Sequence, residues 1–197
     1  MLIICAKIGH MTNPELNKIK EPLHDQSRTL QVGLETEKNL ALAERVVSEL
    51  RSKKLYISTM ESCTGGALAY YITNIPGASE VLKDAFVTYA NEAKIKMGVP
   101  SDVIDNYTVY SRETAIAMAE TVLKSSLKAD VGVGITGSIS RVDPNNPNSK
   151  PGEIFLAVKY QDRVLDKKLT IDAERRFEVK QQVVGEALSA ILEIISE

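Results

Sequence analysis

The segment STMESCTGGALAYY (58–71) places a carboxylate, hydroxyls, a thiol and two glycines between a β-type run and a helix-forming run. Ser62 would lie at a strand-to-helix turn, where unpaired backbone N–H groups favour a developing oxyanion. Gly65 and Gly66 would let a ligand approach the backbone closely. The pattern predicts a serine nucleophile, and it leaves open the alternative that Ser62 or Thr64 only caps the helix.

A serine nucleophile needs a base, usually histidine, but the chain has only His10 and His24, both in its N-terminal segment. A lysine can replace histidine, because burial disfavours the charged ammonium and a neutral amine accepts a proton. Lys94 follows a predicted strand and is the best placed candidate, although most lysines are solvated surface groups. Cys63, the rival nucleophile, has no nearby histidine, and we interpret it as a buried and inert thiol.

Tyr89 and Asn91 accompany Lys94 and could donate hydrogen bonds to a carbonyl or a ribose. A core tyrosine and a helix cap are the alternative interpretation of this pair. In the long loop that follows the strand 129–137, Arg141 and Lys150 could hold a phosphate or carboxylate, whereas Asp143 could not.

Arg176 and Lys180 are four residues apart on one face of the last predicted helix. This spacing indicates a second possible anion contact. A solvated charged face is the alternative.

The composition narrows the class of function. The chain has 197 residues, 44% of them hydrophobic and 25% charged, as expected for one globular domain with one substantial core. A formal net charge of −2 argues against nucleic acid or an anionic membrane as partner and favours a small molecule. Cys5 and Cys63 are too few for a disulfide framework and are not spaced as metal ligands. The cysteines therefore predict no structural zinc, and no cofactor is expected. Because no apolar stretch approaches about 20 residues, the sequence predicts a cytoplasmic protein.

The fold prediction starts from two regions. Residues 1–35 have no sustained periodicity and are predicted to be an appendage, partly ordered at best. Residues 36–197 are predicted to form the domain, beginning with a helix that Thr36 caps. The predicted strands are 54–61, 85–90, 106–111, 129–137 and a hairpin of 152–160 with 163–171. The predicted helices are 36–50, 64–75, 91–98, one that Ser111 caps, and one near the C-terminus.

Because strands alternate with helices, the sequence predicts an α/β fold, a three-layer α/β/α sandwich with a mixed, largely parallel sheet and one antiparallel hairpin. In such a sheet, ligands bind outside the carboxyl ends of the strands. Three loops are expected there, Glu61–Gly66, Tyr89–Lys94 and Thr136–Pro151.

The run ESCTGG…YYITNIPGAS…FVTYANEAKIKMGV…YSRETAIAMAE…ADVGVGITG…PGEIFLAV resembles the CinA carboxy-terminal domain family, also known as nicotinamide-nucleotide amidase or NMN deamidase (PncC). The resemblance covers roughly residues 38–195. It implies metal-independent hydrolysis of nicotinamide mononucleotide to nicotinic acid mononucleotide and ammonia. It also implies a homodimer with a three-layer α/β fold.

The resemblance implies that Ser62 is the nucleophile, that Lys94 is its base and that Tyr89 belongs to the same site. Backbone N–H groups around Cys63–Gly66 would hold the oxyanion, and Thr136 and Gly137 would contact substrate. Together with the anion contacts, the predicted substrate-binding residues are Glu61, Cys63, Thr64, Gly65, Gly66, Asn91, Thr136, Gly137, Arg141 and Arg176.

The sequence departs from the family after the TG of residues 136–137. Family members usually continue with a glycine-rich IAGPGGG-type loop, whereas this chain has SISRVDPNNPNSKPG. Side chains therefore stand where a backbone would approach the nucleotide. Either Arg141 takes over a phosphate contact, or the pocket has changed its substrate. The alternatives to NMN hydrolysis are a catalytically silent nucleotide-binding or regulatory protein and an amidase for another small amide.

Overall fold

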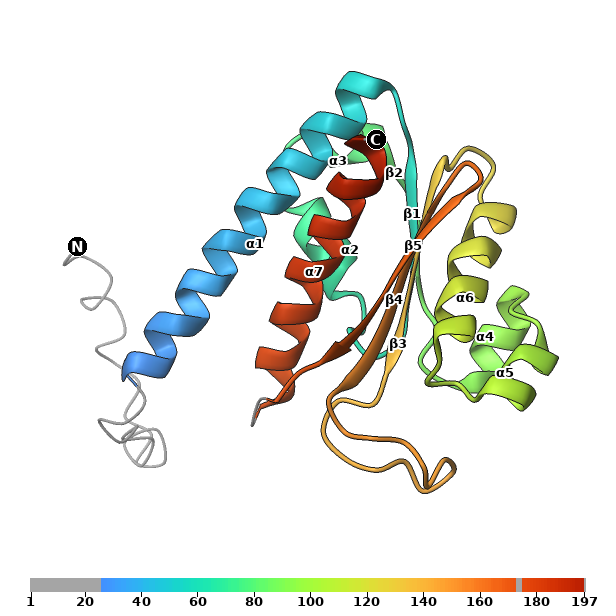
Figure 1. Ribbon diagram of the computed structural model, residues 1–197. Helices are drawn as coiled ribbons and strands as arrows, with labels where there is room; N and C mark the ends of the chain where they lie inside the picture. Colours follow the sequence, from blue (N-terminus) through green and yellow to red (C-terminus); the bar gives the residue numbers. More distant parts are fainter. Residues whose placement is uncertain (1–25, 173–174, 197) are drawn as a thin grey trace, which may run out of the picture. The chain divides into compact units, whose positions relative to one another are not determined.

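The computed structural model describes residues 26–172 and 175–196 (Figure 1). The chain divides into two compact units, Met1–Gly33 and Leu34–Glu197, and the second contains the sheet. Helix α1 (Gln26–Lys53) begins ten residues before the predicted cap Thr36, which lies inside the helix. The earlier start follows from residues 26–35, which include several good helix formers and no proline, so that the helix continues toward the N-terminus.

A five-stranded mixed sheet forms the middle layer. From one edge to the other its strands are β2 (Leu82–Val87), β1 (Ile57–Glu61), β3 (Val131–Gly137), β4 (Glu153–Tyr160) and β5 (Arg163–Thr170). β1 is parallel to both β2 and β3, whereas the β3–β4 and β4–β5 pairs are antiparallel. The predicted hairpin is thus present, and two of the four pairings are parallel.

Helices cover both faces of this sheet (Figure 1), which confirms the predicted three-layer α/β fold. One layer contains α1, α2 (Ala67–Thr73), α3 (Ala78–Val81) and α7 (Arg176–Ser196). The other contains α4 (Asn91–Met97), α5 (Ser101–Tyr107) and α6 (Arg112–Ser125). Within the described ranges, no helix combines the length and the apolar character needed to cross a membrane.

One predicted strand is wrong. Residues 106–111 do not pair with the sheet, because α5 runs through Tyr107 and the chain then turns at Thr108, whose φ is 69°. The predicted cap of the following helix is confirmed, since the Ser111 side chain accepts a hydrogen bond from the Thr114 backbone N–H. The second strand begins at Leu82, three residues before the predicted start.

Strand β3 is buried along its whole length, as its continuous apolar, β-branched character predicted. Two glycines on its α6-facing side let the helix approach closely. A Cβ atom at Gly134 would lie 2.1 Å from the Ala115 carbonyl oxygen, and one at Gly132 would lie 2.3 Å from that of Ala119. The contact between sheet and helix is therefore made by backbone against backbone.

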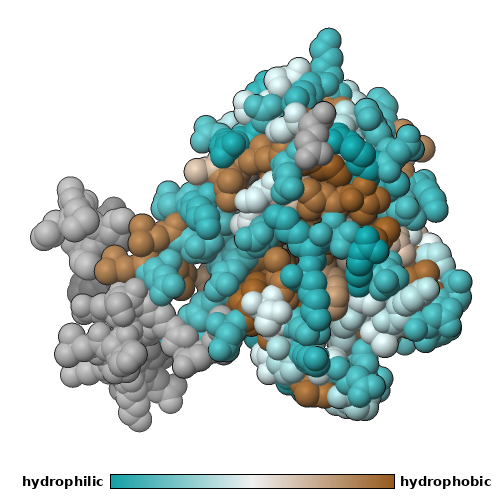
Figure 2. Space-filling view, viewed as in Figure 1, coloured by the Kyte–Doolittle hydropathy of each residue, from teal (hydrophilic) through white to brown (hydrophobic). Residues whose placement is uncertain are grey.

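The opposite face of the sheet packs against α1, α2 and α7 through the largest apolar cluster. Partly buried residues of β5, such as Leu165 and Leu169, belong to it. Figure 2 shows apolar surface among hydrophilic side chains over α7 and the neighbouring strands. Hydrophilic side chains therefore leave part of the apolar surface of this layer exposed on the face shown.

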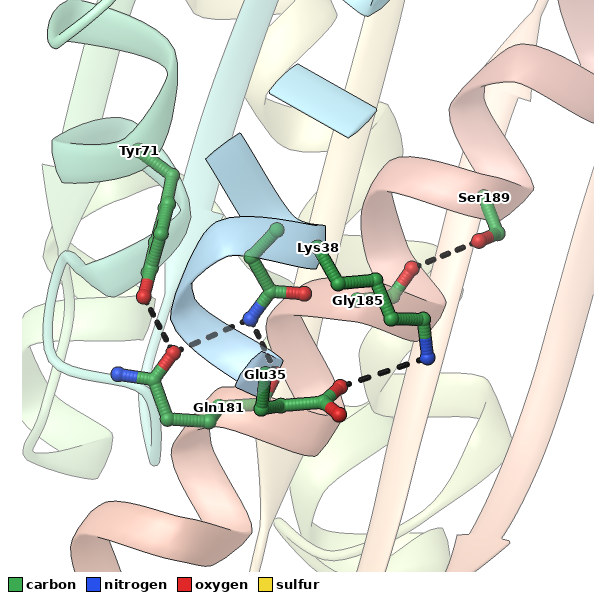
Figure 3. Close-up of polar contacts among 7 residues, drawn as sticks. Glu35, Lys38, Tyr71, Gln181, Gly185 and Ser189 are labelled. Carbon is green, nitrogen blue, oxygen red and sulfur yellow. Dashed lines mark hydrogen bonds and ion pairs between the residues drawn. The ribbon is translucent and has the colours of Figure 1, made fainter. Parts of the chain in front are cut away.

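A buried polar cluster joins three helices of this layer, α1, α2 and α7 (Figure 3). The Asn39 side-chain amide of α1 donates hydrogen bonds to the backbone oxygen of Gln181, at 2.9 Å, and to its side-chain oxygen, at 3.1 Å. The Tyr71 hydroxyl of α2 donates to the same Gln181 side-chain oxygen. A Cβ atom at Gly185 would lie 2.8 Å from Asn39 Oδ1, so this glycine leaves room for the amide. Directional bonds thus fix α7 against its neighbours.

Candidate active site

The predicted nucleophile and base meet at the carboxyl ends of the parallel strands. Ser62 follows β1 directly, and Lys94 lies on α4, which follows β2. Both side chains line a cleft of about 320 Å³. Lys94 Nζ donates a hydrogen bond to Ser62 Oγ at 3.0 Å. When the amine is neutral, its lone pair can accept the serine proton over the same separation.

Lys94 is buried in a way that favours the neutral amine. Its side chain is 0% exposed, and Nζ also donates to the Thr88 backbone oxygen at 2.8 Å. Burial lowers the pKa of Lys94 to about 8, although electrostatic interactions with Cys63 and Glu92 oppose this shift. The group therefore has the protonation behaviour that a base at near-neutral pH requires.

Glu61 shapes the turn that carries Ser62. Its carboxylate is buried and accepts backbone N–H bonds from Gly66 and Leu68, both at 3.1 Å, and from Ala69 at 3.0 Å. A carboxylate is a strong acceptor for such groups at the start of a helix. Glu61 was predicted to contact substrate. Its side chain instead accepts three hydrogen bonds from backbone N–H groups of the turn and of α2.

Gly65 and Gly66 complete this turn with φ values of 65° and 92°. These values lie in the left-handed region, which glycine adopts without strain. The two glycines let the chain reverse immediately after the nucleophile, so that Ser62 faces the cleft and α2 runs away from it.

Cys63 lines the cleft beside the nucleophile, and it is a free and buried thiol. Burial, followed by the negative charge of Glu61, raises the pKa of Cys63 to about 12. The thiol stays protonated at neutral pH, in agreement with the interpretation of Cys63 as inert. Cys5 lies outside the described residues. Among those that are described, no three His, Cys, Asp or Glu side chains are grouped as metal ligands would be.

A second wall of the cleft is formed by α7 and the loop before α4. The Arg176 guanidinium donates hydrogen bonds to the Tyr89 hydroxyl at 3.2 Å and to Ser140 Oγ at 3.0 Å. Asn91, at the start of α4, lines the same cleft. The structure therefore brings the predicted Tyr89, Asn91 and Arg176 to one site.

The third wall of the cleft is the loop after β3. Hydrogen bonds within this loop hold it in its conformation. Gly137 and Arg141 line the cleft, and the Arg141 backbone oxygen accepts a bond from Ser138 Oγ at 2.7 Å. Thr136 is buried, and its hydroxyl donates to the Val109 backbone oxygen at 2.8 Å. Five predicted substrate contacts lie outside the cleft lining: Glu61, Thr64, Gly65, Gly66 and Thr136.

Among the cleft residues that were not predicted as site residues, two bind each other through their side chains. The Tyr110 hydroxyl donates a hydrogen bond to Asp143 Oδ2 at 2.9 Å, and both side chains line the cleft. The sequence pattern predicts that Tyr110 lies in a strand. It excludes Asp143 as a ligand for an anion. The two residues are 33 positions apart, and no periodic pattern connects them.

The site thus places a buried lysine amine beside a serine hydroxyl at the carboxyl edge of an α/β sheet. The chain belongs to the CinA family, since the model of the CinA C-terminal domain matches residues 39–195.

Relatives in sequence carry CinA names. A CinA-like protein of Kosmotoga olearia is 38% identical over 136 residues, which are 68% of this chain and 32% of that protein. A Clostridium beijerinckii protein named for competence-damage induction is 36% identical over 177 residues, which are 89% of this chain and 42% of that protein. The chain thus spans less than half the length of these curated relatives.

The fold matches solved structures of the same superfamily. The competence/damage inducible protein CihA of Agrobacterium tumefaciens has a TM-score of 0.73 and 32% identity, covering 81% of this chain and 96% of that one. A CinA superfamily protein of Escherichia coli has a TM-score of 0.70 and 25% identity, covering 78% and 88%.

Proposed function

We propose that this chain hydrolyses the carboxamide of nicotinamide mononucleotide, giving nicotinic acid mononucleotide and ammonia. Ser62 is the nucleophile and Lys94 is its base. The observation that carries the proposal is the 3.0 Å separation between Ser62 Oγ and Lys94 Nζ, together with the burial that lowers the pKa of the amine. Family membership and the resemblance in the ESCTGG and YANEAK motifs supply the substrate.

In the first step, Ser62 Oγ attacks the carboxamide carbon while its proton passes to Lys94 Nζ. The C–N bond then breaks, and ammonia leaves with the proton that Lys94 returns. This gives an acyl-enzyme on Ser62. A water molecule, deprotonated by Lys94, attacks the ester, releases the carboxylic acid and restores the serine hydroxyl. The net reaction adds one water and releases one ammonia.

The oxyanion of each tetrahedral intermediate needs backbone donors near Ser62. Within the turn, the Gly65 N–H donates to the Ser62 carbonyl at 3.0 Å, and the Gly66 N–H donates to Glu61. These two donors are already engaged. We assign this task to the N–H groups of Cys63 and Thr64, which in the absence of substrate point toward the Cys63 sulfur.

The phosphate is assigned to the cationic side of the cleft. Arg176 and Arg141 both line it, and a guanidinium binds phosphate through a fork of parallel donors. Tyr89 lies against Arg176 and helps to orient it. The homodimer and the cytoplasmic location predicted from resemblance and composition belong to the same proposal.

The direct test is to incubate the purified chain with nicotinamide mononucleotide and to measure ammonia and nicotinic acid mononucleotide in equal amounts. A Ser62→Ala protein purified in parallel controls for contaminating amidases. Tight binding without ammonia would favour the silent nucleotide-binding alternative. Release of ammonia from other small amides alone would favour a changed substrate.

The rate should depend on pH through Lys94. The base must be neutral, and the lowered pKa of about 8 means that the neutral fraction grows as the pH rises toward and past that value. We expect kcat/KM for nicotinamide mononucleotide to increase about tenfold per pH unit below the pKa and to level off above it. A profile that is flat or that falls between pH 6 and pH 9 would contradict the role of Lys94 as base.

A further inference from the structure

One carboxylate in the cleft has no task in the proposed reaction. It belongs to Asp143, in the loop between β3 and β4. Its Oδ2 accepts the Tyr110 hydroxyl at 2.9 Å, and its Oδ1 accepts the Asn145 backbone N–H at 2.9 Å. The Asp143 backbone N–H donates to Ser149 Oγ, also at 2.9 Å. These bonds fix the carboxylate, and since two oxygens accept about four bonds, it keeps capacity for a ligand.

Tyr110 holds this carboxylate in the cleft. Burial, followed by the hydrogen bond to Asp143 and its charge, raises the pKa of Tyr110 to about 12. The phenol therefore stays protonated at neutral pH and keeps donating to Asp143. Cys63, next to Ser62, and Tyr89 line the same cleft as Tyr110.

The cleft also holds a cation on another wall. The recorded partners of the Arg176 guanidinium are the neutral hydroxyls of Tyr89 and Ser140. Among the described residues, neither Asp143 nor Arg176 forms an ion pair. The other carboxylate that lines the cleft is Glu92, which is exposed on α4. Asp143 and Arg176 thus face the cleft without an ion pair among the described residues, and the other cations of the lining are Lys94, which donates to Ser62 and Thr88, and the exposed Arg141.

A ligand that complements this arrangement carries both charges. Its anionic group would lie at Arg176, and its positive charge would lie beside Asp143, on the side of the reacting amide. In nicotinamide mononucleotide the carboxamide is bonded directly to a cationic pyridinium ring, so an amide at Ser62 places the ring charge nearby. Opposite charges in a partly desolvated cleft attract more strongly than in bulk water.

Resting on the proposed function, we infer that Asp143, held by the Tyr110 hydroxyl, recognises the positive charge of the pyridinium ring and selects zwitterionic amides over neutral ones. Asp143 is a specificity-determining residue in this assignment. If Asp143 instead accepted hydrogen bonds from the ribose hydroxyls, its substitution would weaken the binding of both ligands equally. The ribose is the same whether or not the ring is charged.

The test compares two ligands that differ in ring charge. Reduced nicotinamide mononucleotide keeps the carboxamide, ribose and phosphate but has a neutral dihydropyridine ring. Calorimetry on Ser62→Ala protein measures the binding of both forms without turnover. We expect the oxidised form to bind about tenfold more tightly than the reduced form. In Ser62→Ala/Asp143→Asn protein this ratio should fall to near one, with the affinity for the reduced form little changed.

Asp162→Asn, added to Ser62→Ala, is the matched control. Asp162 lies in the β4–β5 turn, after the end of β4, whereas Asp143 precedes its start. The control removes one negative charge from the protein and should keep the tenfold ratio.

A ratio that Asp143→Asn leaves unchanged, or an equal loss of affinity for both forms, overturns the inference while leaving the amidase proposal intact. A Ser62→Ala protein that binds neither form overturns both. Thermal midpoints of the three proteins confirm that each is folded.

Discussion

Lys94→Met should lower kcat for nicotinamide mononucleotide by at least about 10³-fold, because loss of a positioned base removes about 10²- to 10⁴-fold of rate. Ser62→Ala should have an effect at least as large, since no other hydroxyl replaces the nucleophile. The measurement is ammonia release in single-turnover and steady-state assays. A Lys94→Met protein that retains a tenth of the activity would remove this residue from the mechanism.

The loss should be chemical rather than structural. Because the folded state lowers the pKa of Lys94, the proton is held less tightly in the folded than in the unfolded chain. Protonated Lys94 therefore opposes folding below about pH 8, and this opposition fades as the pH rises toward the unfolded value. Methionine has similar length and no charge, so the thermal midpoint should not fall at pH 7.

Lys96→Met is the matched control on the same helix. Lys96 is exposed, and it lies outside the cleft lining. This variant should keep kcat within about twofold of the parent, as surface substitutions have small effects. An equal loss in both variants would indicate that α4, rather than the Lys94 amine, is what activity requires.

Gly134→Ala should give the largest loss of stability among single-methyl additions in the sheet. Its Cβ would lie 2.1 Å from the Ala115 carbonyl oxygen and 2.7 Å from the Ala119 backbone nitrogen. Both atoms belong to the backbone of α6, so no side-chain rotation can relieve the contact. Overpacking of this kind costs about 3 kcal/mol, which lowers Tm by roughly 10 °C in a domain of this size.

Gly33→Ala is the control for the glycine change itself. No atom lies within 4 Å of the Cβ position at Gly33, an exposed position in α1. Alanine there should stabilise the helix by up to about 1 kcal/mol. Calorimetric or denaturant unfolding measures both variants. A Gly134→Ala midpoint within about 2 °C of the parent would show that the β3–α6 contact can expand freely.

The pairing of Ser62 with Lys94 could be predicted from sequence because both follow parallel strands, whose carboxyl ends meet at one edge of the sheet. The same principle placed the loop that carries Arg141. The placement of these residues at one edge of the sheet follows from the order of strands and helices. It can be predicted without knowledge of any side-chain contact.

The wrongly predicted strand at 106–111 shows that a local sequence pattern is not enough to assign the secondary structure of a short segment. Tyr107 and Val109 alternate with polar residues as in a strand, but Ile104 and Val109 instead join an apolar cluster with Met118. Tertiary packing thus overrides a local β preference in a short segment. Once this segment was taken for a strand, Tyr110 could not be recognised as a cleft residue.

Glu61 illustrates a different limit. A carboxylate next to a nucleophile was interpreted as a substrate contact, yet a buried carboxylate first needs partners of its own. The backbone N–H groups of Gly66, Leu68 and Ala69 are those partners. Only the three-dimensional path of the turn shows that these donors converge on one side chain.

Helix α7 carries Arg176 at its first residue and Gln181 five residues later. Since Asn39 and Tyr71 bind Gln181, the rotation of α7 about its axis depends on α1 and α2, none of whose described residues lines the cleft. Under the proposed function, engineering of the cleft for another mononucleotide has to consider the packing of α7 as well as the loop between β3 and β4. Substitutions on α1 should therefore be included among the variants tested. In laboratory evolution, substitutions of Asn39 should alter substrate preference.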